Sequence, residues 1–248
     1  MASPGLDSRE TRDFAREVKF LIDARLGPDV LGWMRANLSA DQHGGGEFGD
    51  EYKTTSLYFE TTKFDVYHRH ASFGRSKFRV RRYGLLDFIF LERKFRTDRL
   101  LAKRRTTVPV EELQKLASDE PDPTWKGYWF HRRVLMRGLQ PKIQMSYHRV
   151  ARVTQTATGL LRVTFDTNLR VLPMPDRAFL PGVGLPLLED KIIIEVKYRV
   201  ELPPMIKLMA ETFGLQIERV SKYRLGLGAL DYAPKAKDES DEQRPRAS

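Results

Sequence analysis

Cysteine is absent from the 248-residue sequence. Its absence excludes disulfides, thiolate metal ligands and a cysteine nucleophile, and it fits a reducing compartment. Long apolar runs are also absent: the longest are short, strand-like pieces such as Ile192 to Ile194, well below the roughly 20 residues of a membrane-spanning helix. The N-terminal stretch MASPGLDSRETRDFARE has no apolar segment typical of a signal peptide. We therefore expect a cytoplasmic protein without a membrane span, and the sequence leaves a membrane-protein partner open.

Acidic residues are outnumbered, with 33 Asp and Glu against 43 Lys and Arg, a formal net charge of +10 and a pI near 9.8. Such an excess favours an anionic partner, which could be nucleic acid, membrane headgroups, nucleotides or polyphosphate. Hydrophobic residues make up 41% and charged residues 31% of the chain. This composition is typical of one globular core under a heavily charged surface.

Helix signals are few, and apolar residues mostly alternate with period two. Helices are expected at Pro28 to Leu38, Val110 to Ala117 and Pro203 to Phe213. Strands are expected at 15–23, 51–59, 76–83, 87–96, 100–108, 141–153, 160–166, 190–200 and 216–220. The pattern indicates a closed antiparallel barrel or a sandwich at residues 14–232. The polar ends, 1–13 and 233–248, are expected to be disordered.

Charged side chains recur on one face of several predicted strands, because residues i and i+2 share a face. Glu195 and Lys197 alternate with apolar neighbours, and the same spacing relates Glu17 to Lys19, Glu92 to Lys94, and Arg79 to Arg81; Arg162 lines up with Thr164 and Asp166. On a single strand this pattern is typical of a solvent-facing surface. Repeated on five strands and gathered inside a barrel, like charges about 4 Å apart repel by about 4 kcal/mol at an effective dielectric near 20. Such a face needs an anion or a metal ion to balance it.

The residue types favour phosphate over other anions. Arginine offers a planar fork to phosphate oxygens and lysine a point charge, while glutamate there serves as a ligand for a divalent cation. The histidines show no metal-ligand spacing. The aromatic residues Trp125 and Tyr128 to Phe130, beside basic residues 131–133, indicate packing more than base stacking.

The sequence also resembles a known family through a series of motifs in the expected order. These are YKTTSLYFET (52–61), FRVRRYG (78–84), FLERKFRTD (90–98), MSYHRVA (145–151), LRVTFDT (161–167), IIIEVKYR (192–199) and SKYRLG (221–226). They are similar to the VTC domain, the catalytic part of the eukaryotic polyphosphate polymerase, within the triphosphate tunnel metalloenzyme (CYTH-like) superfamily. The wider superfamily's Glu-x-Glu-x-Lys signature would place its first glutamate at Ala15, so the resemblance is to the VTC branch.

The resemblance implies an α+β, mainly β fold: an eight-stranded antiparallel β-barrel tunnel with a few flanking helices. It implies catalytic phosphate ligands at Lys19, Arg79, Arg81, Lys94, Arg149, Arg162 and Lys197. Further substrate contacts are implied at Lys103, Tyr147, Ser221 and Lys222. It implies a Mn²⁺ or Mg²⁺ ion on Glu195, with Glu17 and Glu92 as supporting acids.

The implied function is metal-dependent phosphoryl transfer, foremost polyphosphate synthesis from ATP by a polymerase-like phosphotransferase. The expected partners are ATP or another triphosphate and inorganic polyphosphate, with no nucleic acid. Two alternatives stay open: a tri- or polyphosphate hydrolase, and a polyphosphate-binding sensor or scaffold without turnover.

Overall fold

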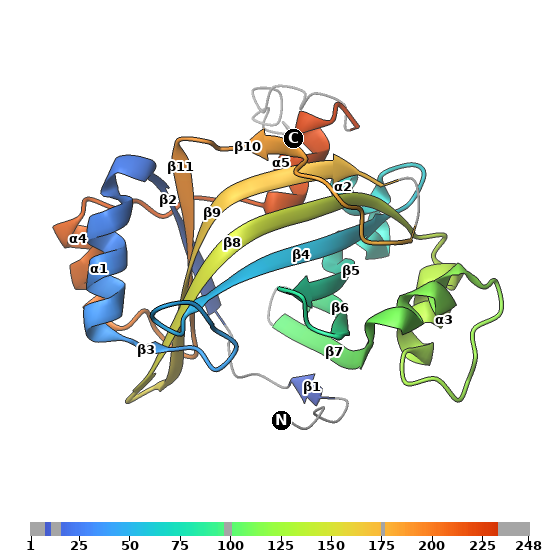
Figure 1. Cartoon of the computed structure of the whole chain (residues 1–248), viewed down its shortest axis with the longest axis horizontal. Coiled ribbons are helices and arrows are strands. Elements are labelled where there is room, and N and C mark those ends of the chain that lie inside the picture. Colours follow the sequence, from blue (N-terminus) through green and yellow to red (C-terminus); the bar gives the residue numbers. More distant parts are fainter. Residues whose placement is uncertain (1–7, 11–15, 97–100, 175–176, 233–248) are drawn as a thin grey trace, which may run out of the picture.

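One mainly antiparallel sheet organises the chain in the computed structural model, which describes residues 8–10, 16–96, 101–174 and 177–232 (Figure 1). The strand order is β1-β7-β6-β5-β4-β8-β9-β11-β2, with β10 on β9 and β3 on β8. The strands are β1 (Ser8–Glu10), β2 (Arg16–Asp23), β3 (Ser39–Ala40), β4 (Glu51–Glu60), β5 (Ser76–Tyr83), β6 (Phe88–Arg96), β7 (Leu101–Pro109), β8 (Gln140–Thr156), β9 (Gly159–Pro173), β10 (Leu185–Leu187) and β11 (Lys191–Tyr198).

The mainly β, antiparallel class is confirmed, but the closed eight-stranded barrel is not. Eight long strands are present, with three short ones, β1, β3 and β10, added to them. In the described residues no backbone pairing joins β2 to β7 or β1, so the sheet has two ends. A side-chain contact still connects the two halves of the sheet, because Lys94 Nζ on β6 lies 3.4 Å from a carboxylate oxygen of Glu17 on β2. The sheet is therefore strongly curved and tunnel-like, without a closed hydrogen-bonded barrel.

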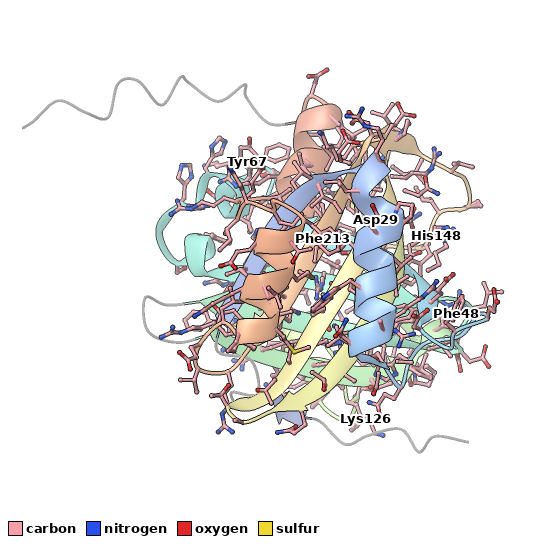
Figure 2. The ribbon with its side chains drawn as sticks, turned by 90° about the vertical axis from the view of Figure 1, so that its left-hand side faces the viewer. Asp29, Phe48, Tyr67, Lys126, His148 and Phe213 are labelled. Atoms are coloured by element: carbon pink, nitrogen blue, oxygen red, sulfur yellow. The ribbon has the colours of Figure 1, made fainter. Side chains whose placement is uncertain are left out.

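Two helices cover the outer face of β9, β11 and β2 (Figure 2). They are α1 (Gly27–Asn37) and α4 (Pro204–Thr212). Pro28 lies in the first turn of α1, where a backbone N–H would have no partner within the helix. Val30 and Met34 of α1 and Ile206 and Met209 of α4 are buried in this core. The alternate residues of these strands consequently point to the opposite, inner face.

The short segment η1 (Ala24–Leu26) joins β2 to α1, and the other helical segments pack elsewhere on the sheet. They are α2 (Asp65–His68), η2 (Ala71–Arg75), η3 (Val110–Ala117), α3 (Tyr128–Met136) and α5 (Lys222–Ala229). Helix α3 lies on the outer side of β5 to β7, where Phe130 meets Phe78 edge to face with ring centroids 5.7 Å apart. Helix α5 approaches β8 so closely that a Cβ on Gly226 would lie 2.7 Å from Met145 Sδ. Glycine there lets α5 cover one end of the inner face.

Several expectations about local structure need correction. The segment 216–220 is not a strand; only Ile217 forms an isolated bridge, with Phe20. Helices α2, α3 and α5 were not predicted. Strand β1 lies inside the stretch 1–13 that we expected to lack structure, while the rest of that stretch and 233–248 lie outside the described residues. In the described ranges, none of the helices has the length and apolar character that crossing a membrane requires.

Candidate functional site

The strand register places the predicted site residues on one surface, here called the inner face. Directly opposed residues of antiparallel strands share a face. Glu195 pairs with Lys19 and Thr164, and Arg79 pairs with Tyr58 and Glu92. By register, spacing and side-chain contact the inner face carries the cations Lys19, Lys77, Arg79, Arg81, Lys94, Lys103, Arg105, Arg149, Arg162, Lys197 and Lys222 and the acids Glu17, Glu92, Asp166 and Glu195. Cations clearly outnumber acids on this surface.

Two ammonium groups bridge three carboxylates on the inner face. Lys19 Nζ lies 3.6 Å from Glu17 and 3.3 Å from Glu195, and it donates a hydrogen bond to the Val220 carbonyl at 3.0 Å. Lys222 Nζ lies 2.8 Å from Glu195 and 2.7 Å from Asp166. Burial opposes both ammonium charges, but the attraction of these carboxylates outweighs it and raises the pKa of Lys19 and of Lys222. Both lysines are therefore charged at neutral pH.

Glu92 sits among cations. Its carboxylate contacts Arg79 Nε at 2.5 Å, Lys103 Nζ at 3.1 Å and Arg105 Nη2 at 2.5 Å, and the residue is only 1% exposed. Burial favours the neutral acid, yet Arg79, Lys103 and Arg105 together hold the pKa of Glu92 well below its usual range. Glu92 is therefore ionised, and its negative charge holds the three cations in place.

Arg81 and Lys77 differ from their neighbours, since neither has a carboxylate partner among the described residues. Arg81 is 5% exposed, and within the described ranges it donates hydrogen bonds only to the hydroxyls of Ser56, at 2.9 Å, and Tyr147, at 3.1 Å. Lys77 Nζ lies 3.5 Å from Ser221 Oγ, and burial lowers the pKa of Lys77 to about 8. Buried charges are normally paired. Two cations without acids on one strand therefore indicate a place for an anion.

The remaining predicted cations line the opposite side of the inner face. Arg149 makes a bidentate pair with the fully buried Asp166, with both nitrogen–oxygen distances 2.6 Å. Arg162 donates to Asp41 at 2.8 Å and to the Tyr52 hydroxyl at 2.9 Å. Lys197 Nζ is 3.8 Å from Glu17, and burial lowers the pKa of Lys197 to about 7 despite the attraction of Glu17 and Glu195. Lys197 is therefore only partly protonated at neutral pH, and a bound anion would favour its protonated form.

Helix α5 and its N-cap contribute two of the predicted substrate contacts, Ser221 and Lys222. Ser221 is its N-cap, accepting a hydrogen bond from the Arg224 amide, and this cap directs Lys222 onto Glu195 and Asp166. Tyr223, next along, donates a very short hydrogen bond to Glu60. The helix start is therefore anchored to the sheet on both sides of Lys222.

The donor set fits a hard divalent cation, although the described residues hold no preformed cluster of three or more His, Cys, Asp or Glu side chains. Glu17 and Glu195 both contact the Lys19 ammonium, so a cation at that point would meet two carboxylates. Mg²⁺ and Mn²⁺ prefer such oxygen ligands. The metal roles of Glu195, Glu17 and Glu92 stay predictions.

The site holds residues that the sequence did not single out. Lys77 and Arg105 lie two residues from Arg79 and from Lys103, so the i,i+2 rule places them on the inner face. The sequence already placed Asp166 on one face with Arg162, but gave it no role. Tyr58 accepts a hydrogen bond from Arg79 and Tyr83 from Arg105. No periodicity signal distinguishes these tyrosines from core aromatics, so their role emerges only from the contacts.

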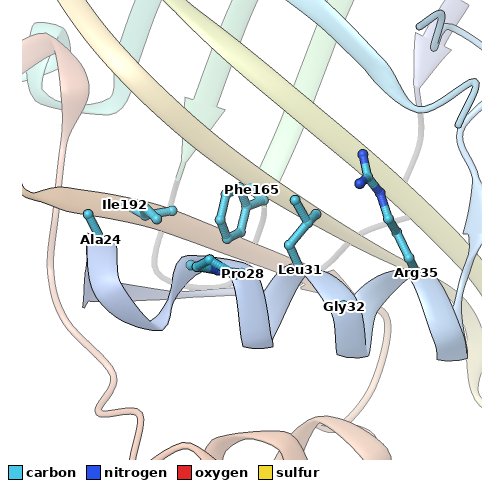
Figure 3. A pocket seen from close by; sticks show the side chains of 8 residues that line it. Ala24, Pro28, Leu31, Gly32, Arg35, Phe165 and Ile192 are labelled. Atoms are coloured by element: carbon cyan, nitrogen blue, oxygen red, sulfur yellow. The ribbon is translucent and has the colours of Figure 1, made fainter. Parts of the chain in front are cut away.

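A separate cleft of about 450 Å³ lies on the other side of the sheet (Figure 3). Leu31 of α1, Phe165 and Ile192 are among the side chains that line it. It shares no residue with the inner face. Its lining is mainly apolar, which is unlike a site for a highly charged ligand.

Comparison with known proteins supports the same fold. The VTC domain family matches residues 14–230. A putative adenylate cyclase from Bacillus halodurans is similar in structure, with a TM-score of 0.55, 16% identity, and coverage of 85% of this chain and 95% of that chain. HpAC1 from Hippeastrum, a putative adenylyl cyclase described as having a dominant triphosphatase activity, has a TM-score of 0.51, 12% identity, and coverage of 86% and 95%. No curated protein matches the chain.

The family match spans nearly all of the described sheet, and its boundaries enclose every residue of the inner face. The solved structures, at their low identity, support the fold alone. The chain therefore belongs to the VTC domain family.

Proposed function

We propose that this protein carries out metal-dependent phosphoryl transfer on triphosphate or polyphosphate, foremost the synthesis of polyphosphate from ATP. The observation that carries the proposal is Arg81, a buried guanidinium without a carboxylate partner in the described structure, beside Arg79 and Lys77. A buried charge of this kind is costly unless a ligand of opposite sign completes it. A chain of phosphates supplies several such charges at close spacing.

The protein's own groups would bind and orient the phosphates. Phosphoryl transfer depends mainly on positioning and charge neutralisation. Arg79 and Arg105 are held rigid by Glu92, and Arg149 by Asp166, so their forks are oriented before substrate arrives. Lys197 would gain its full charge as the anion approaches, because burial, with repulsion from Arg162 and Lys94, holds the pKa of Lys197 near 7. The acceptor would be the end of a polyphosphate chain, aligned with the terminal phosphate of ATP.

Glu195 and Glu17 would hold Mn²⁺ or Mg²⁺, with Glu92 as a further acid, and the ion would neutralise charge on the phosphates. Lys19, now between Glu17 and Glu195, would then turn its ammonium toward the phosphates. Lys222 would keep its ion pair with Asp166. The role of Asp166 in this scheme is to hold Arg149 and Lys222 in position.

A hydrolase is the second candidate. It is supported by the structural similarity to HpAC1, which is described as having a dominant triphosphatase activity. In this case water is the acceptor, and Glu17 or Glu92 would orient it. The binding residues are the same in both candidate functions. The two functions differ only in the acceptor of the terminal phosphate, which is polyphosphate in one and water in the other. A polyphosphate sensor or scaffold without turnover is the third.

The test is incubation of the purified protein with ATP and Mn²⁺ or Mg²⁺, with polyphosphate, phosphate and ADP assayed separately. ADP together with polyphosphate is the expected result for the polymerase. Phosphate without polymer would assign the hydrolase. The absence of any product, with tripolyphosphate still bound, would leave a binding protein and refute turnover.

A further inference from the structure

Four arginines gather on the outer side of the sheet, behind the inner face. Arg93 of β6 and Arg104 of β7 are directly opposed in the register, and each alternates with inner-face residues such as Lys94 and Lys103. Arg133 lies in the last turn of α3, and Arg137 is the C-cap of that helix, one turn further on. Figure 1 shows α3 beside β7. These four residues are here called the outer arginine cluster.

Aromatic rings hold the guanidinium groups of the outer arginine cluster in place. Arg104 lies over Trp129 at 4.2 Å from the ring centroid, Arg93 over Phe95 at 4.9 Å, and Arg137 over Phe73 at 4.6 Å. Trp129 is itself fixed, since its Nε1 donates to Thr106 Oγ1 at 2.8 Å. Stacked guanidinium groups lose little further freedom when an anion binds.

Three members of this cluster have no acidic partner among the described residues. Within the described residues, Arg93, Arg133 and Arg137 form no ion pair; Arg93 donates to the Ser76 hydroxyl at 3.0 and 3.2 Å and Arg137 to the Ser72 hydroxyl at 2.8 Å. Arg137 Nη1 is shielded from solvent and has no hydrogen-bond partner there. Burial, followed by repulsion from Arg133, Arg137 and Arg104, lowers the pKa of Arg93 to about 10. The four charges therefore act on one another at short range.

We infer that the outer arginine cluster is a second anion site, which binds a segment of inorganic polyphosphate on the outside of the sheet. The inference rests on the proposed function in taking polyphosphate as the ligand. A linear polyphosphate carries closely spaced oxyanions that match forked guanidinium groups side by side. A chain too long for the inner face could then be held at a second point, which raises the effective concentration of its remaining length near the protein.

Nucleic acid fits the cluster less well. Binding of single strands uses aromatic faces on which bases stack. Here a guanidinium already covers a face of Trp129, of Phe95 and of Phe73. The cluster therefore offers charge more than stacking surface.

The test compares two charge reversals at adjacent positions of α3. Arg133→Glu changes the cluster, while Arg132→Glu changes an exposed arginine that is not among the charges acting on Arg93. Both side chains are exposed, so neither change disturbs the core. Binding of long-chain polyphosphate, tripolyphosphate, duplex DNA and polyglutamate would be measured by calorimetry at fixed salt.

We expect Arg133→Glu to weaken long-chain polyphosphate binding about tenfold more than Arg132→Glu, with tripolyphosphate binding unchanged in both. An equal loss in the two variants would show an effect of net charge alone and overturn the inference. A loss confined to DNA or to polyglutamate would assign the cluster to a different partner and also overturn it. Failure of the proposed function is distinguishable, because it would appear as absent tripolyphosphate binding in the wild type.

Discussion

Replacing Arg81 by methionine should weaken phosphate binding without weakening the fold. Arg81 is 5% exposed, has no carboxylate partner in the described structure, and bonds only to the hydroxyls of Ser56 and Tyr147. Removing a charge-assisted contact to phosphate costs about 1.5–3 kcal/mol, or roughly a ten- to hundredfold loss of tripolyphosphate affinity. Methionine has a similar length and keeps most of the packing of the alkyl stem.

The stability effect should have the opposite sign. Replacement of a buried charge by an apolar side chain commonly stabilises a protein by about 1–4 kcal/mol. Leaving the Ser56 and Tyr147 hydroxyls without a donor costs about 1–3 kcal/mol. The expected balance is near zero or a gain of about 1 kcal/mol, which raises the melting temperature by about 2–4 °C.

Calorimetric titration with tripolyphosphate and a thermal melt, both without metal, measure the two effects. The control is Arg82→Met, because Arg82 lies on the other face of β5 and donates to backbone carbonyls of residues 85 and 86. The control should leave tripolyphosphate affinity unchanged. If Arg81→Met lowers the melting temperature sharply and leaves affinity intact, Arg81 is structural and the reasoning fails.

Three further predictions follow from the same contacts. Glu195→Gln should abolish metal-dependent turnover but preserve metal-free tripolyphosphate binding, since it removes a ligand charge near Lys19 and Lys222; activity near wild type would transfer the metal role to Glu17 or Glu92. Because the pKa of Lys197 is about 7 and an anion raises it, binding should take up a proton and weaken as pH rises through 7. Buffer-dependent calorimetry measures this uptake, and Lys197→Arg should reduce it; equal uptake in both proteins contradicts the assignment. Gly226→Val should destabilise the fold by about 1–3 kcal/mol in urea unfolding, because its Cβ would press on Met145 and Ile143, and an unchanged midpoint would show that α5 is not tightly docked.

Much of the inner face could be predicted because charged residues at i and i+2 on strands share a face whatever the tertiary structure. The strands predicted at 76–83 and 190–200 match β5 (Ser76–Tyr83) and, less closely at its ends, β11 (Lys191–Tyr198). The rule also places Lys77, Arg105 and Asp166 correctly once the neighbouring residues are assigned.

What could not be predicted depends on contacts between distant segments. Helix α3, YWFHRRVLM, lacks a side-chain cap and begins with three aromatic residues of weaker helix propensity, and it is stabilised by packing of Phe130 under the sheet. Helix α5 contains two glycines, and its docking against β8 is favourable only because Gly226 has no Cβ. Closure of the barrel depends on pairing between the ends of the sheet, about which local sequence says nothing.

The central claim is that the inner face binds a chain of phosphates, and a crystal structure with tripolyphosphate and Mn²⁺ tests it most directly. We expect phosphate oxygens within hydrogen-bond distance of Arg79, Arg81 and Lys197, with Mn²⁺ on Glu195. Tripolyphosphate bound only on the outer surface, with Arg81 still bonded solely to Ser56 and Tyr147, would contradict it.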